Sequence, residues 1–307
     1  MTRSPHDPLL LPPLPLAEWR ETRDTLQLWT QIVGKVRMAL SPPVNHWWHV
    51  TLYVSARGLA TSAVPWPGGL FEIEFDFLDH QLRIETSDGA AKRVALAPRT
   101  VADFYADVMA SLHSLGIEPK FHAHPDEIPD AIPFAEDRVH RTYDPAQANR
   151  FWRALVAIAP VFQEFRSRFQ GKCSPVHFFW GAFDLAVTRF SGRGAPERPG
   201  ADRVLREGYS HECSSAGFWT GGASGVDEAV FYSYMAPEPE GFRETRVRPG
   251  AAYYHEGFGE FLLPYEDVRR SDSPQETLLA FFQSCYDAGA NLAKWDRAAL
   301  ERQRPES

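Results

Sequence analysis

Three residues in the second half of the chain have side chains suited to acid–base catalysis, and they are His177, Asp184 and His211. An imidazole titrates near neutral pH, and a carboxylate can orient it or exchange a proton with it, so these are the predicted catalytic groups. Asp184 lies in an apolar run beside small alanines, where a carboxylate is costly unless it is paired. Arg189 or a histidine is its expected partner, and a purely structural ion pair is the alternative.

Aromatic and polar residues of the same motifs predict a binding surface around these groups. Tryptophan side chains form flat apolar walls, and a few polar side chains orient a small molecule against them. His211 and Glu212 fall in a stretch that reads as a glycine-flanked loop, a kind of segment that often carries function. The predicted binding residues are Asn45, His46, Trp48, Trp180, Arg189, Glu212 and Trp219.

Metal and cofactor motifs are weak. His46 and His49 share a face only on a helix or a turn, whereas their segment reads as a strand. His122 and His124 share a strand face but lie at the edge of a linker. The sequence has no phosphate-binding glycine loop and no dinucleotide fingerprint. No metal ligand is therefore predicted, nicotinamide and adenine cofactors have no support, and the cofactor is unknown.

Two motifs occur twice in the same order, which indicates an internal duplication. A serine–proline motif leads into His46 and again into His177, and a tryptophan before a glycine pair follows at Trp66 and again at Trp219. The second copy carries about 22 more residues between its motifs, a length that repeats accommodate as a loop. Histidines present in both copies are favoured as structural residues, and those present in one copy are freer to specialise.

Hydrophobic periodicity predicts the same order of elements, helix, strands and helix, in both halves. The clearest strand is 71–77, where apolar residues alternate with carboxylates, and it forms a hairpin with 81–86. Pro160 is expected to kink its helix. Helices are predicted over 16–40, 101–115, 145–169 and 274–292, strands over 47–56, 71–77, 81–86, 94–96, 176–190, 230–235 and 260–263, and a linker over 122–143.

Composition excludes several classes of protein. The 307 residues carry a formal charge of −8, unlike a nucleic-acid binder, and no apolar run is long enough to cross a membrane. The leucine-rich start is interrupted by prolines and does not read as a secretory leader. Three widely spaced cysteines suit a reducing cytosol, and Cys173, beside Lys172 and four residues before His177, leaves thiol catalysis open. We expect a soluble cytoplasmic protein of unknown oligomeric state.

Several stretches carry a family resemblance. Residues 171–181 read Gly-Lys-Cys-Ser-Pro-Val-His-Phe-Phe-Trp-Gly, 184–192 read Asp-Leu-Ala-Val-Thr-Arg-Phe-Ser-Gly, and 44–49 and 209–212 add to the pattern. Over nearly its whole length the chain resembles an uncharacterised bacterial family of unknown function. The resemblance implies a bacterial protein of one recurring architecture, and it implies no activity.

These patterns predict an α+β fold of two related helix–antiparallel sheet–helix halves, arranged as a pseudo-twofold pair. The first half spans 1–143, with a proline-rich lead and a linker, and the second spans 144–307, with an inserted loop over 191–213. A small molecule is expected to bind between the halves in a pocket lined by histidine and tryptophan, with proton transfer by histidine and aspartate. Side chains of His46 and His177 more than about 15 Å apart would exclude such a shared site. Enzymatic activity is left open, and the alternatives are a non-catalytic ligand-binding module and a structural or interaction protein.

Overall fold

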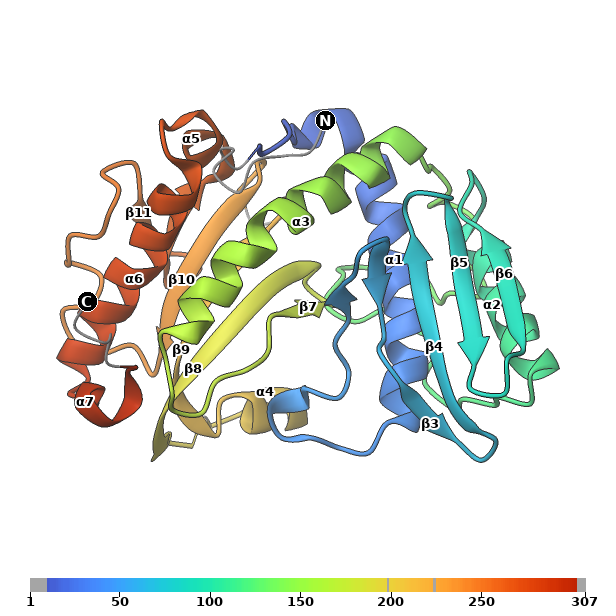
Figure 1. Cartoon of the computed structure of the whole chain (residues 1–307), viewed down its shortest axis with the longest axis horizontal. Coiled ribbons are helices and arrows are strands. Elements are labelled where there is room, and N and C mark those ends of the chain that lie inside the picture. Colours follow the sequence, from blue (N-terminus) through green and yellow to red (C-terminus); the bar gives the residue numbers. More distant parts are fainter. Residues whose placement is uncertain (1–9, 198, 223–224, 303–307) are drawn as a thin grey trace. The chain divides into compact units, whose positions relative to one another are not determined.

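The computed structural model describes residues 10–197, 199–222 and 225–302, so the first part of the proline-rich lead lies outside it. The described residues group into two compact units of helices and antiparallel strands (Figure 1). The β1–β6 unit is formed by 16–156 and 177–184, and the β8–β12 unit by the described parts of 1–15, 157–176 and 185–307. The units interleave along the chain, and the division into halves at 143 and 144 stays a prediction.

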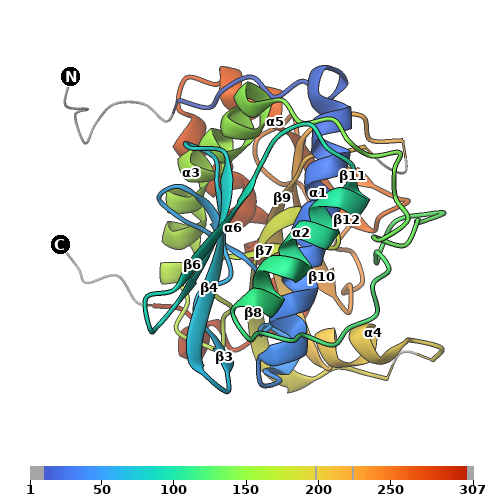
Figure 2. The same ribbon diagram turned by 90° about the vertical axis from the view of Figure 1, so that its right-hand side faces the viewer.

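In the β1–β6 unit, two helices lie along one face of an antiparallel sheet (Figure 2). The strand order is β1-β2-β4-β5-β6, and β3 pairs with β4. Trp29 stacks on Phe104 at 4.3 Å, and Phe104 stacks on Phe75 at 6.5 Å, which joins both helices to the sheet. The elements are α1 Leu16–Leu40, η1 Asn45–Trp47, β1 Tyr53–Val54, β2 Gly58–Ala60, β3 Val64–Trp66, β4 Gly69–Asp76, β5 Gln81–Thr86, β6 Ala91–Ala95, α2 Val101–Ser114 and β7 His177–Phe179.

In the β8–β12 unit, the antiparallel strands follow the order β11-β12-β10-β9-β8. Phe282 of α6 packs edge-on against Phe162 at 4.9 Å and Phe231 at 6.1 Å, so aromatic side chains form this core. The elements are β8 Asp184–Gly194, α4 Arg203–Gly208, β9 His211–Trp219, β10 Val230–Ala236, β11 Tyr253–His255, β12 Glu260–Pro264, α5 Tyr265–Arg270, α6 Pro274–Leu292 and α7 Arg297–Leu300. The chain passes between the units just before α1, within α3 Pro145–Ser167, just before β7 and at the start of β8.

The predicted mixture of helices and antiparallel sheets is confirmed. Helix α1 has the predicted bounds, as does α6, and β4 pairs with β5 in the predicted hairpin. Phe71, Ile73 and Phe75 alternate with exposed or half-buried residues, which explains why their pattern reads so clearly as a strand. Helix α3 continues through Pro160.

The structure corrects the two strands that were predicted around the histidine motifs. The segment 47–56 is mostly a turn, because His46 and Trp47 both adopt left-handed backbone conformations, with φ of 57° and 61°. The segment 176–190 is two strands, β7 and β8, separated by a turn in which Phe183 has a φ of 61°. Side chains of these types rarely adopt such conformations, so the turns leave no mark in the sequence.

The predicted loop over 191–213 is also corrected, because much of it is regular structure. Strand β8 continues to Gly194, and helix α4 follows, with the side chain of Asp202 accepting the N–H of Leu205 as its N-terminal cap. Strand β9 then begins at His211, so His211 and Glu212 lie on a strand.

The duplicated motifs occupy different local structures. His46 lies in the turn η1 and His177 begins β7, while Trp66 and Trp219 each end a strand. The internal duplication and the pseudo-twofold arrangement stay predictions. None of the helices in the described chain combines the length and apolarity that a bilayer crossing requires.

Candidate functional site

The segment that carries His177 is joined to the β1–β6 unit just before β1. Leu52 and Phe178 exchange two backbone hydrogen bonds, at 2.9 and 2.8 Å. The buried indole of Trp180 donates from Nε1 to the carbonyl oxygen of Val50 at 2.7 Å. These three bonds fix His177 beside the strand that begins at Tyr53.

Helix α1 packs against this segment from one side. A Cβ atom at Gly34 would lie 2.2 Å from two atoms of the Trp180 ring, so the close approach requires glycine there. Gln27, two turns earlier, donates to the carbonyl oxygen of Gly181 at 2.6 Å. Trp180, a predicted binding residue, thus anchors the segment that carries His177.

Tyr53 and His177 form the polar pair of the candidate site. The Tyr53 hydroxyl lies 3.4 Å from Nε2 of His177, and the two rings meet edge-on with their centres 5.5 Å apart. His177 is 0 % exposed, whereas Tyr53 is half-buried. Tyr53 is therefore the member of the pair that solvent reaches.

Arg37, in the last turn of α1, extends this pair into a polar chain. Its guanidinium donates to the carbonyl oxygen of Thr51 and lies 5.1 Å from the centre of the Tyr53 ring. Burial lowers the pKa of Arg37, and the charge and hydrogen bonding of Tyr53 act in the opposite direction. A buried cation therefore adjoins the tyrosine–histidine pair.

The indole of Trp48 contacts two of the predicted site histidines. Its ring centre lies 5.5 Å from that of His46 and 6.0 Å from that of His177. Two rings that contact one indole lie within the roughly 15 Å that a small ligand can bridge. His46 is buried, Trp48 is half-buried and Asn45 is exposed. The structure therefore brings His46, Trp48 and His177 together in the β1–β6 unit.

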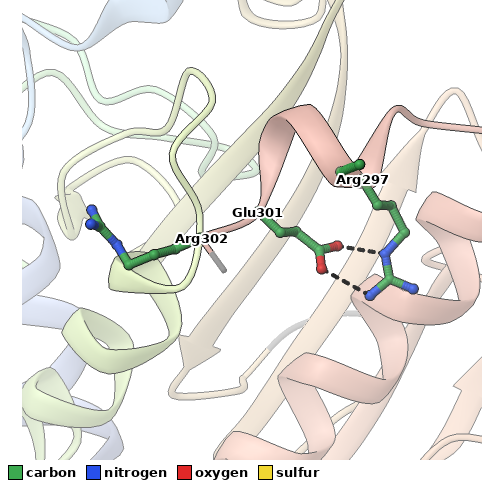
Figure 3. A pocket seen from close by; sticks show the side chains of 4 residues that line it. Arg297, Glu301 and Arg302 are labelled. Carbon is green, nitrogen blue, oxygen red and sulfur yellow. Dashed lines mark hydrogen bonds and ion pairs between the residues drawn. The ribbon is translucent and has the colours of Figure 1, made fainter. Parts of the chain in front are cut away.

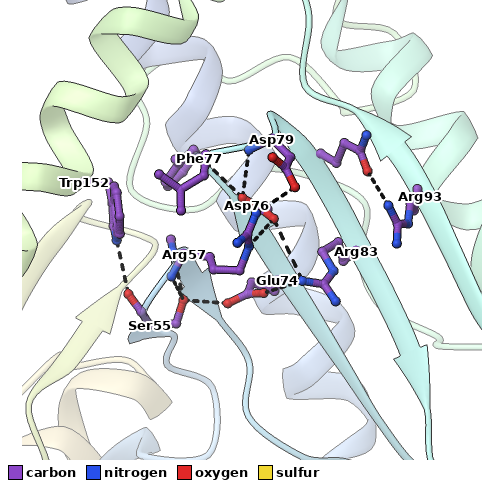
Figure 4. A network of polar contacts seen from close by, with 12 residues as sticks. Ser55, Arg57, Glu74, Asp76, Phe77, Asp79, Arg83, Arg93 and Trp152 are labelled. Atoms are coloured by element: carbon purple, nitrogen blue, oxygen red, sulfur yellow. Dashed lines mark hydrogen bonds and ion pairs between the residues drawn. The ribbon is translucent and has the colours of Figure 1, made fainter. Parts of the chain in front are cut away.

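A network of charged residues holds the turn that follows β1 (Figure 4). The Ser55 hydroxyl donates to Glu74 at 2.6 Å, and Nε of Arg57 donates to the buried Asp76 at 2.6 Å. Burial raises the pKa of Asp76, but hydrogen bonds from Arg57 and from backbone N–H groups outweigh it and leave the pKa lower than usual. Because Tyr53 begins this hairpin, the network also holds Tyr53 in place.

Asp184 and Arg189 both lie on β8. Asp184 is buried at the start of the strand. The guanidinium of Arg189 lies 3.5 Å from the ring centre of Phe165 and 4.4 Å from that of Tyr286, and it donates to the Phe165 carbonyl oxygen. Burial lowers the pKa of Arg189 to about 10, with the ionisable Cys173 acting most strongly the other way. Arg189 is thus enclosed by aromatic rings, and its pairing with Asp184 stays a prediction.

The remaining predicted residues lie on β9 of the β8–β12 unit. Glu212 forms an ion pair with Arg193 at 2.6 Å, so its negative charge is compensated by a side chain of that unit. His211 precedes it on the strand, and neighbouring strand residues point to opposite faces. Trp219, at the end of β9, meets Phe258 edge-on at 5.8 Å.

Cys173 lacks the environment of a nucleophilic thiol. Burial raises its pKa to about 11, although the charges of Arg189 and Arg166 act in the opposite direction. Lys172, which the sequence suggested as the activating charge, lies 5.0 Å from the ring centre of Phe190. The thiol is therefore protonated at neutral pH.

No three histidine, cysteine or carboxylate side chains of the described residues are gathered as a metal site requires. His122 and His124 stack with ring centres 5.5 Å apart, and Nδ1 of His49 accepts the backbone N–H of Val44 at 3.1 Å.

A depression of about 320 Å³ lies on the β8–β12 unit, and its lining in the described chain contains none of the predicted site residues (Figure 3). Arg297 at its edge pairs with Asp287 at 2.6 Å and with Glu301 at 2.5 Å, so its charge is compensated. The depression is lined by Arg297, Ala298, Glu301 and Arg302.

The comparison with known families gives one match. The model of a family of unknown function, DUF5996, covers residues 11–302. The chain belongs to this family. No curated protein and no solved structure matches it. Membership in DUF5996 confirms the resemblance seen in the sequence and carries no activity with it, so function must be argued from the site itself.

Two members of the site, Arg37 and Tyr53, were not predicted from the sequence. The available signal was a basic residue on the buried part of a helix, since Arg37 follows Val33 and Val36 in the last turns of α1. Tyr53 gave no comparable signal, because aromatic residues are ordinary in strands.

Proposed function

We propose that the chain binds a small molecule at the surface formed by Trp48 and Tyr53, with the hydroxyl of Tyr53 as the polar contact. This proposal rests on which side chains of the site solvent can reach. Trp48, Tyr53 and Phe179 are half-buried, while His177 and Arg37 lie behind them and are buried. A ligand would meet the aromatic rings and the hydroxyl first.

The pair supports acid–base chemistry as the finer form of this proposal. A tyrosine hydroxyl can give a proton to a bound molecule, and Nε2 of His177, 3.4 Å behind it, would return a proton to the phenolate from an imidazole protonated on both nitrogens, which then becomes neutral. This relay differs from the predicted set of His177, Asp184 and His211, because the group nearest to solvent is Tyr53 and not one of those three. The roles of Asp184 and His211 stay predictions.

Backbone strain favours a binding role over a purely structural one. The left-handed conformations of His46 and Trp47 each cost on the order of 1 kcal/mol, and such strain concentrates where function requires it. The same turn places Trp48 against both histidines. A fold that needed only a structural turn would gain stability from glycine at these positions.

The test compares two tyrosines that each contact a histidine. Tyr143 is buried, and its hydroxyl lies 2.9 Å from Nδ1 of His80, so Tyr143→Phe is the matched control for Tyr53→Phe. A ligand-observed NMR screen with neutral and charged fragments should give binders that lose about 5- to 10-fold in affinity in Tyr53→Phe. The same binders should keep their affinity in Tyr143→Phe. Binders that are insensitive to Tyr53→Phe, or a screen without binders, would refute the proposal.

A further inference from the structure

The positive charge of Arg37 has no carboxylate partner among the described residues. Arg37 is 7 % exposed, its guanidinium donates to the Thr51 carbonyl oxygen, and its Nε has no hydrogen-bond acceptor in the described chain. Two other buried charges of this unit are paired: Lys35 lies 2.6 Å from Asp126, and Asp76 lies 2.6 Å from Arg57. Arg37 differs from both of them.

A buried guanidinium without a counter-charge is costly for a folded chain. The carboxyl end of α1 compensates it in part, because the helix dipole favours a cation in the last turn. The described groups in contact with the guanidinium are the Tyr53 ring and the Thr51 carbonyl oxygen, and neither is a carboxylate. The site therefore has an unbalanced positive charge behind a hydroxyl donor.

We infer that the small molecule bound at the proposed site carries a carboxylate on an aromatic or apolar body. The carboxylate would accept a hydrogen bond from Tyr53, and the body would lie against Trp48 and Phe179. This inference rests on the proposed function and adds the chemical class of its ligand.

The charge effect is large enough to measure. An anion about 8 Å from a guanidinium, at an effective dielectric constant of about 20, gains roughly 30-fold in affinity over a neutral molecule of the same shape. Side-chain rings at Trp48 and Phe179 would contribute equally to both molecules. The ratio of the two affinities therefore isolates the charge.

Benzoate and benzamide are suitable probes because they have nearly the same shape and differ in charge. We expect the wild-type chain to bind benzoate with a Kd on the order of 1 mM and benzamide at least 10-fold more weakly. Arg37→Met should remove most of this preference, and Arg37→Lys should retain part of it. If Arg37→Met does not fold, the wild type alone provides the test: raising NaCl from about 0.05 to 0.5 M should weaken benzoate and leave benzamide unchanged.

The outcomes separate the two proposals. Equal affinities for benzoate and benzamide, both lowered in Tyr53→Phe, would overturn the carboxylate and leave the binding site standing. If neither probe binds but other fragments bind in a manner that depends on Tyr53, the inference of a carboxylate ligand is wrong and the proposed binding site stands. Benzoate binding that is unaffected by Tyr53→Phe would overturn both.

Discussion

Replacing Gly34 by alanine sets two opposing effects against each other within helix α1. Alanine is better than glycine in a helix by about 1 kcal/mol, so an exposed substitution would stabilise the protein. The added Cβ would lie 2.2 Å from two atoms of the Trp180 ring, far inside normal contact distance. Overpacking of this kind costs about 1–3 kcal/mol, and displacement of the indole would also weaken its hydrogen bond to Val50, worth about 1 kcal/mol. The net expectation is a loss of about 2 kcal/mol in the free energy of unfolding.

A second helical glycine provides the matched control. A Cβ at Gly289 of α6 would lie 2.4 Å from Met235, nominally almost as close. Methionine has three rotatable bonds and can move aside, whereas the Trp180 indole is rigid and held by its hydrogen bond. Gly289→Ala should therefore cost less than 1 kcal/mol.

Urea unfolding followed by circular dichroism measures both effects, and a double-mutant cycle assigns the cause. In a Trp180→Leu background the conflicting ring atoms are gone, so Gly34→Ala should regain its helix propensity and stabilise by about 1 kcal/mol. The coupling between the two positions should then be about 3 kcal/mol. A stabilised Gly34→Ala single variant, or a cycle without coupling, would show that Trp180 does not hold this segment as described.

Two further predictions concern titration. Burial lowers the pKa of His80 from the usual 6.5, so the unfolded chain takes up this proton before the folded chain as the pH falls. The stability of the protein should therefore decrease below pH 6.5. The plot of Tm against pH should be flatter in His80→Gln, and an unchanged slope would contradict the assignment. With a pKa of about 11, Cys173 should react with iodoacetamide at pH 8 about 100-fold more slowly than an ordinary thiol, and a normal rate measured by mass spectrometry would count against its burial.

Most of the regular structure could be predicted from the sequence, because burial imposes its period on the side chains. Phe71, Ile73 and Phe75 alternate along β4 because one face of that strand is buried. Helix α1 could be bounded from its apolar spacing and from the prolines that follow it. Both signals are local, because each depends only on residues that are close together in the chain.

The candidate site was only partly predictable, because it depends on contacts that no local pattern encodes. Tyr53 and His177 are 124 residues apart in the chain, and nothing in either motif indicates the other. The turns at His46 and Phe183 have left-handed backbone at residues that seldom adopt it, so the local pattern predicts strands there. His46, Trp48 and His177 were selected by residue type and motif, and the structure places them together.

The interleaving of the units has a consequence for synthesis on the ribosome. The β1–β6 unit is completed by 177–184, and its bonds from Gln27 to Gly181 and from Trp180 to Val50 join residues 154 and 130 positions apart. At bacterial or eukaryotic elongation rates, Tyr53 leaves the ribosome on the order of 10 s before His177 does. During that interval the nascent chain has α1 and most of its sheet but no partner for Leu52. The candidate site is therefore assembled late, when a segment made much later returns to a unit whose other elements are already present.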